Sequence, residues 1–177
     1  MQALTFWKLV AVDQSDLLER LIAVLGEHAI RYCVIGGQAV NAYVEPLVSL
    51  DLDLVIAVDQ LAEAESLLAD SFKVERFPHR LNVSLPGSDL RVQIQTDPRY
   101  ARFLDRAAQR EVLGLVLPVA SVEDVLQGKI WAAMDETRRA SKRQKDMADI
   151  MRLVETREDL ISLIPESLRK RMYPDKL

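Results

Sequence analysis

One segment of the chain, IGGQAVNAYVEPLVSLDLDLVIA at residues 35–57, restricts the fold more than any other part of the sequence. It contains two adjacent glycines after a short apolar run and two aspartates inside a second apolar run. Aspartate is depleted in β-strands, so two like charges in one strand require a compensating function. Because strand side chains alternate between faces, Asp51 and Asp53 share one face, while the leucines beside them point to the other.

The paired carboxylates are candidate ligands for a divalent cation. Two residues on one strand face lie ~7 Å apart at their Cα atoms, so both carboxylates can reach one ion. Mg²⁺ binds a few carboxylate oxygens and completes its octahedron with phosphate and water. The alternative is a half-exposed strand with solvated aspartates, but Val55 and Ala57 continue the aspartate face with apolar groups. The apolar groups indicate that this face is partly covered, so the aspartates are not simply solvated. A cation between Asp51 and Asp53 would also relieve their repulsion, and both points favour these residues as Mg²⁺ ligands.

The glycine pair Gly36-Gly37 follows the apolar run YCVI and precedes QAVNAYV, a segment of helical character. Glycine lets the backbone approach a ligand closely, and N–H groups at the start of a helix bind phosphate. The alternative is a tight turn without a ligand. A strand, a glycine pair, a short helix and a strand with Asp-x-Asp form a more specific combination than either motif alone. Together they predict a nucleotide-phosphate site.

The order of elements predicts a mixed α+β fold for residues 1–120 and a helical part, packed on it, for residues 121–177. Helical character marks the segments 17–25, 59–72 and 100–112, and the capping-box pattern SVED opens two C-terminal helices at Ser121. Alternation or short apolar runs predict strands at 31–35 (ending in the glycine turn), 49–58, 73–77, 81–85, 89–96 and 113–119. The tripeptide Pro86-Gly87-Ser88 predicts a turn that joins two of these strands in a hairpin.

Composition excludes several functional classes. The formal net charge of −4 argues against a protein whose whole surface grips nucleic acid, although the run RRASKRQK at 138–145 offers a local basic patch. The single cysteine, Cys33, excludes an internal disulfide and lies in an apolar run that predicts a buried, inert thiol. No segment has the pattern of a targeting signal or of a membrane span, so we expect a cytoplasmic protein without membrane contact.

The motif regions together resemble a known family. GGQAVNAYV followed by SLDLDLVI resembles the core of the nucleotidyltransferase (DNA polymerase β-like) superfamily, and more narrowly the AbiEii-type abortive-infection toxins and related toxin–antitoxin nucleotidyltransferases. Those families often carry threonine two residues before the first aspartate, and Ser49 holds that place here. The segment GKIWAAMDETRRASKRQKDMADIMRL resembles the same toxins' helical lysine and Lys/Arg-Asp-x-x-Asp segments. That match places four residues on the family's motif: Lys129, Lys145, Asp146 and Asp149.

The resemblance implies a nucleotidyltransferase fold, with a mixed β-sheet flanked by helices, and a Mg²⁺-dependent transfer of a nucleoside monophosphate from an NTP to RNA or protein. It implies that Asp51 and Asp53 hold Mg²⁺ and act in catalysis together with the four C-terminal motif residues. The residues implied to contact the nucleotide are Gly36, Gly37, Ser49 and Gln93. The resemblance further implies a toxin-type role in a toxin–antitoxin or phage-defence system, with a cognate antitoxin as a protein partner.

The sequence departs from that pattern at the third carboxylate, which active members usually carry on a neighbouring strand. Gln93 aligns there, and its amide offers a metal one neutral oxygen but cannot act as a base. Asp89 and Asp97 share its strand parity, yet each is four residues away, or ~13 Å along an extended strand. Two alternatives therefore stay open. One is an impaired member that binds nucleotide or a partner protein without efficient transfer, and the other is an antibiotic-modifying type that acts on a small molecule.

Overall fold

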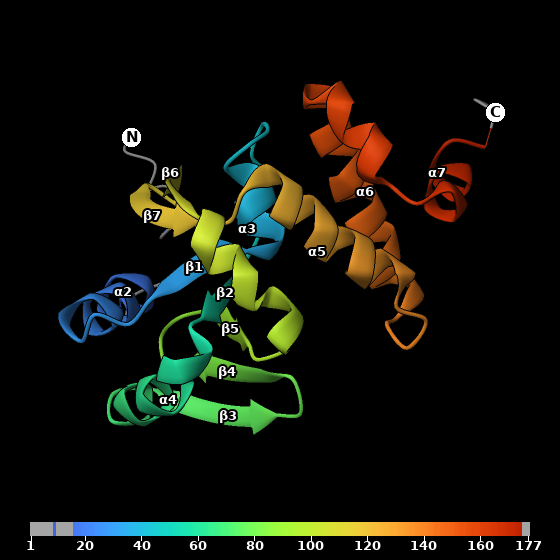
Figure 1. The fold of residues 1–177 in the computed structure, drawn as a ribbon. Helices are drawn as coiled ribbons and strands as arrows, with labels where there is room; N and C mark the ends of the chain where they lie inside the picture. Colours follow the sequence, from blue (N-terminus) through green and yellow to red (C-terminus); the bar gives the residue numbers. More distant parts are fainter. Residues whose placement is uncertain (1–8, 10–15, 175–177) are drawn as a thin grey trace.

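The computed structural model describes residue 9 and residues 16–174 of the chain, and a seven-stranded mixed sheet lies at its centre (Figure 1). The strands are β1 (Tyr32–Ile35), β2 (Asp51–Ile56), β3 (Lys73–Phe77), β4 (Arg80–Ser84), β5 (Arg91–Gln95), β6 (Ala108–Val112) and β7 (Leu115–Val119). Their order across the sheet is β3-β4-β5-β2-β1-β7-β6. The two strands of the glycine–aspartate segment, β1 and β2, therefore lie in the middle of the sheet.

Both parallel and antiparallel pairings occur in the sheet. β1 pairs antiparallel with β2, whereas β2 pairs parallel with β5 and β1 pairs parallel with β7. The two ends of the sheet are antiparallel, with β3, β4 and β5 at one end and β6 and β7 at the other. The predicted α+β class with a mixed sheet and the predicted hairpin between β4 and β5 are both confirmed.

Helices flank the sheet. α2 (Leu17–Glu27), α3 (Gly36–Asn41) and α4 (Leu61–Ala69) alternate with the first strands along the chain, and α5 (Val122–Met134), α6 (Ala140–Thr156) and α7 (Glu166–Met172) follow the last strand. Within residues 16–174 the short 3₁₀ segments are η1 (Val58–Gln60), η2 (Pro98–Arg106) and η3 (Glu158–Leu163). α5 contacts both α3 and α6, and Figure 1 shows α6 and α7 on the side of α5 that faces away from the strands.

The predicted helix at 100–112 is wrong. The first part of this segment belongs to the 3₁₀ segment η2, and the last part is β6, which pairs with β7. Leu113 and Gly114 join these strands with φ angles of 56° and 82°, the left-handed geometry of a tight two-residue hairpin. Closing this hairpin pairs the backbone of β6 at the edge of the sheet, and that pairing outweighs the weak local helical preference.

The apolar faces of the sheet and the helices meet in one continuous core. Cys33 is fully buried in β1, and burial raises the pKa of its thiol to about 12, as predicted for an inert cysteine. At the start of α5, the Ser121 hydroxyl accepts a hydrogen bond from the Asp124 N–H at 3.2 Å, as the capping-box pattern predicts. In the part of the chain that the structure describes, no helix is both long enough and apolar enough to cross a membrane.

Candidate functional site

Asp53 lies at the centre of the candidate site. It is on β2, opposite Ile35 on β1 and opposite Gln93 on β5. Burial raises the pKa of its carboxyl group to about 6, the charge of Lys129 counteracts this rise, and the charge of Asp51 adds to it. The Asp53 side chain is half-buried. A carboxylate withdrawn from water in this way costs stability unless a cation compensates for its charge, as a metal-bound phosphate would.

The turn at Gly36 is built around that carboxylate. Gly36 is the first residue of α3 and has a φ of +67°, which residues with a side chain rarely adopt. A Cβ atom added there would overlap Oδ2 of Asp53 and lie 2.9 Å from its Cβ and Cγ atoms, so only glycine leaves room for this side chain. An added Cβ at Gly37 would meet only the Ser49 hydroxyl, 4.0 Å away. Phosphate binding by the two glycines stays a prediction, and Gly36 has the further role of seating Asp53.

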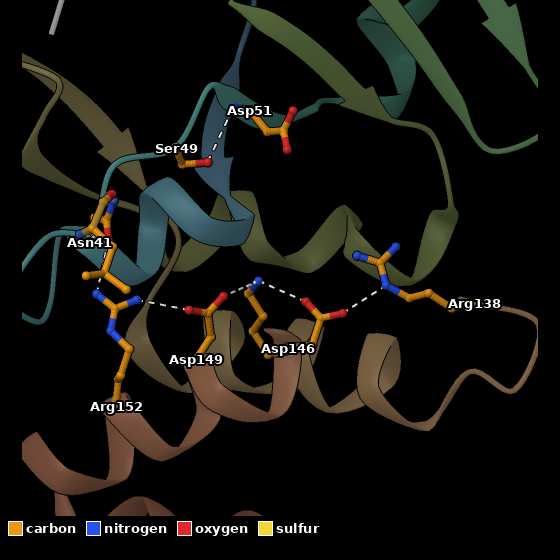
Figure 2. A network of polar contacts seen from close by, with 9 residues as sticks. Asn41, Ser49, Asp51, Arg138, Asp146, Asp149 and Arg152 are labelled. Carbon is orange, nitrogen blue, oxygen red and sulfur yellow. Dashed lines mark hydrogen bonds and ion pairs between the residues drawn. The ribbon is translucent and has the colours of Figure 1, made fainter. Parts of the chain in front are cut away.

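Asp51 and Ser49 lie beside this centre, at the start of β2 (Figure 2). The Asp51 N–H donates a hydrogen bond to the Ser49 hydroxyl at 3.3 Å, and the Asp51 carboxylate pairs with the Arg91 guanidinium at 2.8 Å. The Ser49 carbonyl accepts a hydrogen bond from the buried Gln38 amide at 2.9 Å, which ties the loop before β2 to α3. Because the Arg91 side chain is largely exposed, its pair with Asp51 is weak and leaves this carboxylate available to a cation.

Gln93 takes the place beside Asp53 that the third carboxylate holds in the family that the sequence resembles. The two residues are directly opposite in the parallel pairing of β2 and β5, so their side chains share one face of the sheet. Neither neighbouring acid substitutes for Gln93. Asp97 caps η2 and accepts hydrogen bonds from Arg99, which hold the pKa of the Asp97 carboxyl group below its usual value. Asp89 precedes β5 at an exposed position.

A cleft of about 440 Å³ opens over this face of the sheet, between the strands and the C-terminal helices. Asp53, Gln93 and Gln95 lie along its strand side, and the Gly36 turn closes one end. The other walls come from the hairpin of β3 and β4, from η2, and from α5 with the start of α6. The cleft therefore joins the half-buried Asp53 to both the N-terminal sheet and the C-terminal helices.

Lys129, on the α5 wall of the cleft, belongs to a buried network of ion pairs. Its ammonium group lies 3.0 Å from Oδ1 of Asp146 and 2.7 Å from Oδ2 of Asp149, and all three side chains are buried. Burial opposes the charge on Lys129, but the two carboxylates outweigh it and raise the lysine pKa. The lysine therefore stays charged and joins α5 to α6.

Two arginines extend this network in both directions (Figure 2). Arg138 pairs with Asp146 at 2.8 Å, and Arg152 pairs with Asp149 at 2.9 Å. Arg152 also donates a hydrogen bond to the Asn41 side chain at 3.2 Å, so the network reaches the end of α3. The charges of the two motif aspartates are thus balanced within the protein, and their main contact is with side chains that hold the helices together.

The structure brings only part of the predicted site into the cleft. The predicted residues that line it are Gly36, Asp53, Gln93, Lys129 and Asp146, and those that do not are Gly37, Ser49, Asp51, Lys145 and Asp149. Lys145 is exposed on α6 and makes no ion pair with any described residue, yet its charge acts on the Asp53 carboxyl group. The catalytic roles of the motif residues stay predictions.

Several residues of the cleft lie outside every motif noted in the sequence, among them Tyr100 on η2 and Arg80 on β4. Tyr100 is buried, and burial raises the pKa of its phenol to about 12. Its ring packs edge-on against Phe103 and Trp131, with centroids 5.1 and 5.2 Å apart, and so attaches η2 to α5. Only folding brings these distant residues together, so no local pattern could have marked them.

No protein-family model and no curated protein matches the chain. The solution structure of the antibiotic-resistance factor ANT(2'')-Ia aligns with it at a TM-score of 0.63 and 13% identity, over 91% of this chain and 94% of that one. The chain has the nucleotidyltransferase fold. The lincosamide antibiotic adenylyltransferase LnuA also aligns, at a TM-score of 0.55 and 14% identity over 79% of this chain and 98% of that one. An antigenic nucleotidyltransferase-like protein from Paracoccidioides brasiliensis aligns at 0.54 and 17%, over 92% and 89%. The narrower resemblance to AbiEii-type toxins stays a prediction.

The donor groups of the site suit a hard divalent cation. Asp51 and Asp53 share one strand face, and Gln93 can add an amide oxygen beside Asp53. Loss of solvent raises the pKa of Asp53, and a cation of this kind would compensate for the charge of its carboxylate. Within the described residues, no group of three or more carboxylate, histidine or cysteine side chains could hold a metal. Phosphate and water would therefore have to complete the coordination of Mg²⁺.

Proposed function

We propose that the cleft binds an NTP together with Mg²⁺ and that the protein transfers the nucleoside monophosphate to an acceptor hydroxyl. The observation that carries this proposal is the Asp53 carboxylate, which lies in the cleft against the Gly36 turn and next to Gln93. This carboxylate has no ion-pair partner among the described residues, and its burial makes the charge costly. A metal-bound triphosphate is a ligand that removes this cost.

In the proposed reaction, the acceptor oxygen forms a bond to the α-phosphorus, and the bond from this phosphorus to the bridging oxygen breaks. Pyrophosphate leaves, and the hydroxyl proton passes to solvent or to the pyrophosphate. Mg²⁺, when bound, neutralises phosphate charge. Asp51 and Asp53 would hold the cation, while Gly36 keeps Asp53 in place. Arg138, in the turn before α6, and Lys145, on α6, extend positive charge towards the phosphates, since both act electrostatically on Asp53.

Gln93 favours a second candidate, a protein that binds nucleotide but transfers it slowly or not at all. A glutamine amide neither carries the charge of a third carboxylate nor accepts the proton of an acceptor hydroxyl. Loss of one positioned general base typically costs ~10²–10⁴-fold in rate, whereas an amide oxygen still supports binding. The two candidates therefore differ in rate and not in ligand.

For the acceptor we propose RNA or a protein, on the resemblance to AbiEii-type toxins, with a toxin-type role and a cognate antitoxin as partner. The competing acceptor class is a small molecule. Two structural neighbours support it. The structure of LnuA contains lincomycin, and a structure of ANT(2'')-Ia contains adenylyl-2''-tobramycin. Sequence identity to both neighbours is 15% or lower, so the similarity is one of fold only. The acceptor is identified by the transfer assay below.

Two measurements test the proposed function. Calorimetric titration with ATP and Mg²⁺ measures binding, and the transfer of label from an α-labelled NTP to total RNA, to protein or to lincomycin measures the reaction. We expect clear binding and slow transfer by the natural chain, and faster transfer by Gln93→Glu, because a carboxylate then faces Asp53. Gln95→Glu is the matched control, since it adds the same charge to the same cleft two residues further along β5.

The outcomes separate the candidates. No measurable binding of Mg²⁺ and ATP would contradict the proposed function altogether. Rapid transfer by the natural chain would exclude the impaired candidate and show that another group takes the acceptor's proton. Equal gains from Gln93→Glu and Gln95→Glu would mean that added charge, and not a carboxylate beside Asp53, changes the rate.

A further inference from the structure

Most charged side chains in the cleft are paired. Asp124 on α5 is held by two nitrogens of Arg106, at 2.6 and 2.9 Å, and the Asp146 carboxylate is held by two cations from α5 and its following turn. Within the described residues this leaves one acidic and one arginine side chain of the cleft without an ion pair, Asp53 at the glycine turn and Arg80 at the start of β4. The cleft thus has an unpaired acid and an unpaired base.

Arg80 is exposed at the start of β4 and is supported by an aromatic ring. Its Cα partners across the sheet are Phe77 on β3 and Gln95 on β5. Its guanidinium group lies 4.9 Å from the centroid of the Phe77 ring, which supports it from one side. Phe77 is itself 41% exposed, so the pair lies open to a ligand in the cleft. An arginine held in this way presents a planar set of N–H donors that suits phosphate.

The sheet register separates Arg80 from the metal end of the cleft. Arg80 is opposite Gln95, Gln93 lies two residues earlier on the same strand, and Gln93 is opposite Asp53. Two strand spacings and the rise of two residues place the Cα atoms of Asp53 and Arg80 roughly 12 Å apart. The strand positions between them on this face carry the neutral amides of Gln93 and Gln95.

We propose that Arg80 forms an anion-binding subsite for the acceptor, and that the acceptor carries a phosphate group near its reacting hydroxyl. This inference rests on the proposed function, which places the NTP phosphates at Asp53. The cations of α5 and α6 act on that end of the cleft, whereas Arg80 lies towards the outer hairpin of the sheet. An acceptor whose hydroxyl is at Asp53 and whose phosphate is at Arg80 would span the neutral amides between them.

The same charge arrangement disfavours a cationic acceptor. A polycationic aminoglycoside such as tobramycin would bring its ammonium groups towards Arg80, and like charges at close range repel. The phosphate could come from a small phosphorylated compound or from the backbone of a nucleic acid, and the two sources share the chemistry that Arg80 recognises. The experiment must therefore compare probes from both sources with a cationic probe.

Binding to the full chain, saturated with Mg²⁺ and a non-hydrolysable ATP analogue, provides the test. The probes are ribose 5-phosphate against ribose, the dinucleotide ApA against adenosine, and tobramycin. We expect at least one phosphate-bearing probe to bind tenfold or more tightly than its phosphate-free counterpart, because a charge-assisted arginine contact is among the stronger polar contacts. Ribose 5-phosphate binding would indicate a small acceptor, and binding by ApA alone would indicate a nucleic acid.

Arg80→Gln should remove this preference, and Arg80→Lys should restore part of it. Arg20→Gln is the matched control, because Arg20 is also exposed and lies 5.5 Å from the centroid of the Phe72 ring, on α2 and outside the cleft. Equal binding of the paired probes, tighter binding of tobramycin, or an unchanged preference in Arg80→Gln would overturn the inference. Failure of the ATP analogue to bind would instead contradict the proposed function, so the two failures are distinguishable.

Discussion

Replacement of Gly36 by alanine should damage both the fold and the site. The φ of +67° at this position costs a residue with a side chain roughly 1–2 kcal/mol. The new Cβ would also overlap Oδ2 of Asp53 and lie 2.9 Å from two more atoms of that side chain. The Asp53 carboxylate must therefore move away from the turn. We expect Gly36→Ala to lower the free energy of unfolding by about 1–3 kcal/mol and to weaken Mg²⁺-ATP binding.

Urea unfolding and calorimetric ATP titration measure the two effects on the same protein. Gly26→Ala is the control, because Gly26 lies in α2, has no positive φ, and has nothing within 4 Å of an added Cβ. Alanine is a better helix former than glycine by up to about 1 kcal/mol, so this control should leave stability unchanged or raise it. It should not change ATP binding, since Gly26 is remote from the cleft.

A double mutant separates backbone strain from the clash with Asp53. In an Asp53→Ala background the contact with the carboxylate is gone, so Gly36→Ala should cost less than it does in the natural chain. Equal costs in the two backgrounds would show that the glycine is required only for its φ angle. Natural stability and natural ATP affinity in the single mutant Gly36→Ala would refute the reasoning as a whole.

Three further predictions concern charge. Lys129→Met should lower the free energy of unfolding by about 3–5 kcal/mol, because it leaves two buried carboxylates without their shared cation. The control Lys145→Met, at an exposed position, should change the free energy of unfolding by no more than about 0.5 kcal/mol in the same urea assay. The folded-state pKa of Asp53 is raised to about 6, so folding favours its protonated form. Stability should therefore fall by on the order of 2 kcal/mol as pH rises from 4 to 7, and Asp53→Asn should remove that slope in pH-dependent unfolding curves. Asp51→Asn should change stability by less than about 1 kcal/mol, because Asp51 pairs with a largely exposed arginine, yet it should weaken Mg²⁺-ATP binding in calorimetry; unchanged affinity would remove Asp51 from the cation site.

Short-range patterns were sufficient to predict the central strands and the site turn. Alternation in β2 and the glycine pair before α3 are both local signals, and each depends on geometry that the backbone itself imposes. The segment 100–112 was predicted wrongly for the complementary reason. Its end became β6 through pairing with β7, and the turn at Leu113 and Gly114 that closes the pair lies outside the segment.

The candidate site was predictable in its residues but not in its charge balance. The motifs predicted Asp51, Asp53 and Lys129 as site residues. Alignment of the segment LRVQIQT with the strand that carries the family's third carboxylate predicted Gln93. No local pattern shows that Asp51 pairs with a residue on β5, or that the Lys129 ammonium group is shared by two carboxylates of α6. These pairs join residues distant in the chain, and burial decides their strength, so both depend on the completed fold.

The two like charges on β2 are accommodated in different ways. Both aspartates are half-buried, but the charge of Asp51 is balanced by Arg91 and so costs little. Asp53 is packed on Gly36 with a raised pKa, so its charge costs the free protein stability. The amide of Gln93 beside it adds no further repulsion, which reduces that cost but also reduces the pull on a cation. A triphosphate that brings its own Mg²⁺ ligands suits such a site better than a free ion does, and nucleotide binding should therefore persist even where transfer is slow.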